Sequence, residues 1–146
     1  MIAAGSNFSV ADINADGKQD MLWQNSTTGS AHAWLSNGTA SFTSSVSLKI
    51  QGSTVSDPAW KLVSAADVNA DGKQDLLWQR STSGTIAAWS SNGTASFTAS
   101  IPLTLGGSNN TDVNRVFVGL ADVNADCRWD ALWWNGSNGN ATAWLK

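Results

Sequence analysis

The sequence of 146 residues contains no glutamate and no tyrosine, and its single cysteine is Cys127. One cysteine cannot form an intrachain disulfide, which excludes a disulfide-stapled scaffold. No apolar run is long enough to span a bilayer, which argues against a membrane protein. Lysine and arginine total eight against eleven acidic residues, without a basic cluster. This balance argues against nucleic acid as a partner, because phosphate binding needs clustered positive charge.

Residues that favour helices are also scarce, whereas Ser, Thr, Gly, Asn, Val and Trp are abundant. This composition favours strands and turns, and the apolar content of 42% is that of a folded protein. With one histidine and one cysteine, no nucleophile and base can be assembled. We therefore expect an all-β protein that is not an enzyme.

The chain repeats one unit three times, with a period of 55 residues. The stretch ADINADGKQD at residues 11–20 returns as ADVNADGKQD at 66–75 and as ADVNADCRWD at 121–130. Residues 11–48 align with residues 66–103 without a gap, and the third copy has no counterpart of residues 39–48. Fixed-period similarity of this kind predicts a repeat architecture.

Each unit is expected to form about four short antiparallel strands, here residues 20–24, 30–36 and 39–48 plus a strand before the acidic stretch. The Asn-Gly pair at residues 37–38 is a strong hairpin signal. Short strands at this period are typical of β-propeller blades, and the repeated tryptophans should fill the seams between blades. The predicted boundaries within one domain, 1–146, are blade 1 at about 6–48, linker 49–59, blade 2 at about 60–103, linker 104–114 and blade 3 at about 115–146.

Propellers typically have about four to eight blades, so three cannot close a ring. Either two chains assemble into a homo-oligomer with about six blades, or the chain is a fragment of a longer propeller.

The acidic stretch places Asp at positions 1, 5 and 9, Asn at position 3 and Gly at position 6. Alternate side chains of a tight loop can converge, and mixed oxygen ligands suit Ca²⁺ better than Mg²⁺ or Zn²⁺. Nine of the eleven acidic residues lie in these three loops. The predicted calcium ligands, with the residue at position 7 supplying its backbone carbonyl, are Asp12, Asn14, Asp16, Lys18, Asp20, Asp67, Asn69, Asp71, Lys73, Asp75, Asp122, Asn124, Asp126, Arg128 and Asp130.

The alternative for these loops is a connection rich in Asx turns that binds no metal. An EF-hand is not expected, because Trp23 and its repeats stand where that motif has a glutamate. In the third loop Cys127 replaces glycine, which should strain the loop and weaken its site if the position needs a positive φ.

The pattern ADxNADGKQDLLWQ, followed by AWxSNG, resembles the FG-GAP/VCBS-type repeat of integrin α-subunit propellers and of many secreted bacterial and fungal proteins. The resemblance implies a propeller with Ca²⁺ in its blade loops and a location outside the cell. No signal peptide is visible in the first residues. Adhesion, lectin and accessory roles all occur on such propellers, so the resemblance does not decide the function.

Carbohydrate binding is the leading functional hypothesis, with free sugar or glycoprotein as partner, because nine tryptophans are many for this length. The candidate ligand-binding residues are those that break the repeat, Trp60, Trp129, Trp134, His32 and Arg80. The tryptophans among them could equally fill an irregular seam. The second hypothesis is a structural or protein-adhesion scaffold, in which residues 49–59 and 104–114 carry the contact, although both stretches also suit plain linkers.

Overall fold

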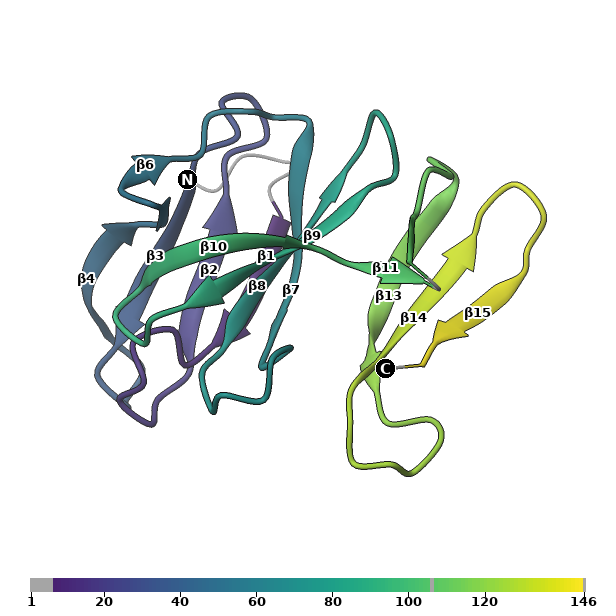
Figure 1. The fold of residues 1–146 in the computed structure, drawn as a ribbon. Coiled ribbons are helices and arrows are strands. Elements are labelled where there is room, and N and C mark those ends of the chain that lie inside the picture. The colour runs from purple at the N-terminus through teal and green to yellow at the C-terminus, as the bar shows by residue number, and fades with distance from the viewer. Residues whose placement is uncertain (1–6, 106, 146) are drawn as a thin grey trace.

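In the computed structural model, every regular element of the described residues, 7–105 and 107–145, is a β-strand (Figure 1). Residues 1–6, 106 and 146, which include the predicted start of blade 1 and the predicted last residue of blade 3, lie outside the described residues. Within those two described ranges, no helix is long and apolar enough to cross a membrane. The chain is all-β, as its composition predicts.

Blade 1 is a four-stranded antiparallel sheet whose strands follow the order of the sequence. β1 (Asn7–Ala11) pairs with β2 (Asp20–Gln24), β2 with β3 (Ala31–Ser36), and β3 with β4 (Phe42–Ser47). The β3–β4 turn contains Gly38 with φ of 82°, a conformation that glycine adopts without steric strain. The acidic loop joins β1 to β2, so it lies at one end of the blade.

The same order of strands returns twice along the chain. Blade 2 comprises β7 (Trp60–Ala66), β8 (Asp75–Arg80), β9 (Ile86–Ser91) and β10 (Ser96–Pro102). Blade 3 comprises β13 (Arg115–Ala121), β14 (Asp130–Asn135) and β15 (Ala141–Trp144). These antiparallel sheets are consistent with propeller blades, and the third has three strands among the described residues.

Each predicted linker between blades contains a short two-stranded pairing. β5 (Lys49–Ile50) and β6 (Ser53–Thr54) form the first, and β11 (Thr104–Leu105) and β12 (Ser108–Asn109) form the second. β5 also pairs in parallel with β10, so the segment that leaves blade 1 extends the sheet of blade 2 to six strands. A pairing of two residues is too short to give a periodic signal in the sequence.

The central blade is buried on both faces because a neighbouring blade packs on each. Every residue of β9 is buried, whereas β2 of blade 1 alternates between buried and half-buried positions. Between blades 1 and 2, Leu22 and Ala33 pack with Trp78 and Phe97. A second, smaller core joins blades 2 and 3 around Ile86, Trp133 and Trp144.

Tryptophan fills both of these seams, as the repeat predicts. The rings of Trp78 and Trp89 pack at a tilt of 37° with 4.5 Å between their centroids, and Trp133 and Trp144 repeat the arrangement at 44° and 5.0 Å. Trp23 and Trp34, the equivalent residues of blade 1, are only half-buried, because no described blade covers that face. The prediction therefore holds for two of the three tryptophan pairs within the described residues.

Glutamine side chains connect successive blades. Buried Gln24 donates from Nε2 to the carbonyl of Trp60 at 2.6 Å, and its Oε1 accepts the N–H of Leu62 at 3.0 Å. Gln79 repeats the first contact with the carbonyl of Arg115, also at 2.6 Å. These bonds join the second strand of one sheet to the first strand of the next.

Candidate functional site

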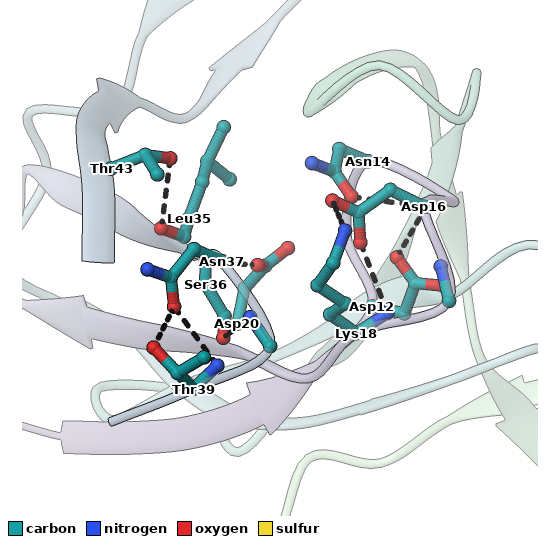
Figure 2. Close-up of polar contacts among 12 residues, drawn as sticks. Asp12, Asn14, Asp16, Lys18, Asp20, Leu35, Ser36, Asn37, Thr39 and Thr43 are labelled. Atoms are coloured by element: carbon teal, nitrogen blue, oxygen red, sulfur yellow. Dashed lines mark hydrogen bonds and ion pairs between the residues drawn. The ribbon is translucent and has the colours of Figure 1, made fainter. Parts of the chain in front are cut away.

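The first acidic loop is wound around its own side-chain oxygens (Figure 2). The Asp12 carboxylate accepts the N–H of Asp16 at 2.9 Å and the N–H of Gly17 at 2.8 Å. Asn14 Oδ1 accepts the N–H of Asp16 at 3.1 Å, and Asp16 Oδ1 accepts the N–H of Lys18 at 3.0 Å. These Asx turns bring Asp12, Asn14 and Asp16 close together, and they are the local contacts that the metal-free alternative predicts.

Two positive φ angles produce this winding in every copy. In the first loop they are 59° at Ala15 and 84° at Gly17. The third loop has 62° at Ala125 and 65° at Cys127. Cys127 therefore occupies the left-handed region, as predicted, and carries steric strain that glycine avoids. The alanine at position 4 was not anticipated, because alanine gives no turn signal.

The second and third loops repeat the hydrogen bonds of the first almost without change. The carboxylate of Asp67 accepts from Asp71 and Gly72, and that of Asp122 accepts from Asp126 and Cys127. The backbone geometry thus survives the replacement of glycine by cysteine.

The aspartate at position 9 has a separate structural role. Asp20 is fully buried, and its two oxygens accept the N–H groups of Ile13 at 3.1 Å and Ser36 at 2.8 Å. Asp75 makes the same pair of bonds with Val68 and Ser91. This carboxylate ties the start of the loop to the end of the third strand, a role that sequence spacing did not predict.

Charges in the loops are only partly compensated by the chain itself. Lys18 Nζ lies 3.0 Å from Asp16 Oδ2, and this bond holds the pKa of Asp16 below its usual value. In the second loop the N–H of Lys73 is the main cause that lowers the pKa of Asp71. Burial raises the pKa of Asp75, and the negative charges of Asp71 and Asp67 add to that increase. A bound cation would relieve this repulsion.

The loops fit Ca²⁺ in the kind of donor they offer. Each presents carboxylate, amide and backbone carbonyl oxygens, and a carboxylate that accepts two hydrogen bonds retains lone pairs for a cation. Among the described residues, however, no three acidic, histidine or cysteine side chains lie together closely enough to form a metal centre. Calcium binding would require Asp16 to exchange its contact with Lys18.

The predicted ligand-binding residues do not gather in one place. Trp60 packs against the core between blades 1 and 2, with the Arg80 guanidinium 5.7 Å from its ring centroid. His32 stacks on Trp23 at 4.7 Å, on the half-buried face of blade 1. Trp134 is exposed beside Val118, on blade 3.

Trp129 lies in a different setting, at a cleft between blades 2 and 3. The cleft has a volume of about 320 Å³, and Ser64, Asp67 and Gln74 of blade 2 line it together with Trp129. The Trp129 side chain is 52% exposed. Ser64 and Gln74 were not anticipated, because both belong to the ordinary repeat and only the arrangement of the blades brings them to Trp129.

Successive antiparallel sheets, each with an acidic loop between its first two strands, define a class of β-repeat protein. Residues 12–78 and residues 67–133 each match the model of the FG-GAP-like repeat. The chain belongs to the FG-GAP-like repeat family, which confirms the resemblance seen in the sequence. Searches of curated proteins and of solved structures gave no match. The matched unit runs from one acidic loop to the tryptophan of the next blade, so it spans a seam.

Proposed function

We propose that this chain is a calcium-stabilised, non-catalytic propeller module that binds carbohydrate. The observation that carries the proposal is the exposed Trp129 beside Ser64 and Gln74 in the cleft between blades. The apolar face of a sugar ring can stack on an indole, and its hydroxyls can bond to a side-chain amide and a hydroxyl. A few polar groups beside an aromatic surface are the usual composition of a small-molecule site.

Calcium has a supporting role in this proposal. The side chains at positions 1, 3, 5 and 9 of each loop, with the carbonyl at position 7, would hold the ion. The ion supplies positive charge that compensates the crowded carboxylates. In the first two loops this stiffens the β1–β2 and β7–β8 connections, and the second of these contains Gln74 of the sugar cleft.

The variant Trp129→Gln tests the sugar site. Glutamine is the residue at the same position of the other two loops, so we expect the fold and the melting temperature to be retained. Glycan binding on an array should fall about tenfold or more, because the stacking surface is lost. Titration of the bound glycan, followed by tryptophan fluorescence, checks the affinity.

Trp134→Gln is the matched control, since it also restores the residue of the other two repeats. It should leave glycan binding unchanged, because Trp134 lines a different hollow. Equal losses in both variants, or an array without any bound glycan, would contradict the proposal.

A protein-adhesion scaffold is the second candidate, and the apolar outer side of blade 3 favours it. Val118 and Trp134 are exposed there on neighbouring strands. A scaffold would bind a protein partner through this surface and would give an empty glycan array. We also propose that the module acts outside the cell, where calcium is abundant, as part of a ring of about six blades formed by two chains or by a longer chain.

A further inference from the structure

The seam between blades 2 and 3 contains a hollow of about 260 Å³, here named the seam hollow. Its lining is almost entirely apolar and comes from both blades. The residues that matter here are Val68, Leu77, Leu103, Trp133, Trp144 and Leu145.

One repeat earlier, the corresponding positions form the packed core between blades 1 and 2. The equivalents of the first five lining residues are Ile13, Leu22, Leu48, Trp78 and Trp89. Two further residues, at the start of β10 and in the turn before it, complete that core. Phe97 packs on Trp89 at 5.8 Å between ring centroids, and the N–H of Ala95 donates to the carbonyl of Ile13 at 3.1 Å. Among the described residues, the seam between blades 2 and 3 has no counterpart of this phenylalanine or of this alanine.

The apolar residues of the second seam are accordingly more exposed than their equivalents in the first seam. Ile13, beneath Ala95, is 1% exposed, whereas its equivalent Val68 is half-buried. Ile50 of β5 packs against the first core, whereas its equivalent Leu105 of β11 is exposed. An outer strand like β10 would cover both positions.

The backbone around the seam hollow also offers two strand edges. In blade 2, β10 lies between β9, its antiparallel partner, and β5, its parallel partner. β15 and β11 are the equivalents of β9 and β5, and among the described residues no strand pairs with both of them. An extended segment that enters here gains main-chain hydrogen bonds as well as an apolar anchor, which is the physics of strand addition.

We propose that β11, β15 and the seam hollow form a docking site for an extended peptide segment of the β10 type. The chain itself defines the chemistry of this occupant, because both of its outer strands begin within the same seven residues, Asn-Gly-Thr-Ala-Ser-Phe-Thr, at 37–43 and at 92–98. The phenylalanine fills the seam hollow against Trp144. The alanine two residues before it donates its N–H to the carbonyl of Val68, as Ala95 does to Ile13.

Binding of a synthetic peptide to the full chain tests this proposal. The probe is a fluorescein-labelled peptide with the sequence of residues 92–103, NGTASFTASIPL, followed by fluorescence anisotropy. We expect saturable binding. A peptide with alanine at the phenylalanine position should bind about tenfold more weakly or less, because burial of the aromatic ring supplies the anchor.

Two exposed residues provide matched protein variants. Leu145 lines the seam hollow and is 58% exposed, so Leu145→Asp should fold and lose about tenfold or more in peptide affinity. Thr82, on an exposed turn of blade 2, does not line the seam hollow, so Thr82→Asp should bind the peptide as the parent chain does. Melting curves establish that each variant is folded.

Several outcomes would overturn the docking site. They are the absence of binding to the parent chain, equal binding of the two peptides, and undiminished binding by folded Leu145→Asp. If Leu145→Asp fails to fold, the comparison of the two peptides on the parent chain still decides the question. A dimer that binds no peptide and that Leu145→Asp converts to monomer would identify a second copy as the occupant, which also overturns the proposal.

Discussion

The side chain at position 6 of each acidic loop decides how much strain the loop contains. Glycine occupies this position in the first two loops with φ near that of Cys127 in the third. A side chain in the left-handed region costs about 1 kcal/mol relative to glycine. The cysteine itself is exposed, so burial does not offset this cost.

We predict that Cys127→Gly increases the free energy of unfolding by about 1 kcal/mol, because the backbone strain is removed. The greater flexibility of glycine in the unfolded chain offsets only part of this gain. Urea titration followed by tryptophan fluorescence measures this change. Cys127→Ser is the control, because serine keeps the strained backbone and removes only the thiol. An equal gain in both variants would assign the effect to the sulfur atom rather than to φ.

Residue patterns in the sequence predicted the glycine conformations and the cysteine strain, but they did not predict the neighbouring alanines. Ala15 and Ala125 have positive φ because the Asx turns on either side force it, and alanine has no property that reveals this. Asp20 was assigned only to the metal, although its burial and its two backbone bonds hold the hairpin together. Such bonds depend on residues far along the chain.

At the level of the element, the acidic loop combines structural and candidate metal-binding contacts. The Asx turns wind the chain without an ion, and the remaining lone pairs of the same oxygens are available to Ca²⁺. Because Ca²⁺ would bind the folded loop and not the unfolded chain, its binding stabilises the fold by mass action.

We predict that Ca²⁺ raises the melting temperature and that chelation with EGTA reverses the rise. At about a hundredfold excess over the dissociation constant, each occupied site adds about 2.7 kcal/mol. Asp16→Ala should remove the part of the Ca²⁺-dependent stabilisation that comes from the first loop, because it deletes one proposed ligand. Calorimetric melts with and without Ca²⁺ measure the increment.

Asp57→Ala is the control for this experiment, although Asp57 is not a neutral surface residue. Its carboxylate accepts the N–H of Ala59 at 2.9 Å and lies 3.6 Å from Arg80. Its loss should lower the melting temperature by the same amount in Ca²⁺ and in EGTA. If Ca²⁺ raises the melting temperature of Asp16→Ala as much as that of the parent chain, calcium does not bind in the first loop.

Strands and hairpins were largely predictable at this level, and the pairing between elements was not. Asn-Gly turns and alternating apolar residues identify the strands of each blade locally. The parallel pairing of β5 with β10 joins segments 47 residues apart, at Lys49 and Ser96, and leaves no periodic trace. The cleft beside Trp129 likewise depends on Trp129 meeting Ser64 of another blade.

At the scale of the whole molecule, the outer sides of blades 1 and 3 have no covering blade among the described residues. Val10 and Val118 are exposed on these two end blades. Apolar surface of this kind favours association, and closure of a ring would bury it.

We predict that the chain in calcium buffer has the mass of two copies, measured by light scattering. Val118→Asp should shift the mass to that of one copy, because it places a charge on the outer side of blade 3. Thr82→Asp, on an exposed turn of the central blade, is the control and should leave the mass unchanged. A single-copy mass for the parent chain at all concentrations would contradict the two-chain ring.

In a single copy, β9 is completely buried between two blades that each have one side without a covering blade among the described residues, and this implies a gradient of rigidity along the described part of the chain. In linear arrays each unit is held by its neighbours, so the terminal units open more readily than the middle one. Amide protons of the central sheet should exchange last with deuterated water, and those of the flanking sheets first. A module built in this way can fray and reseal at its ends while its middle remains closed.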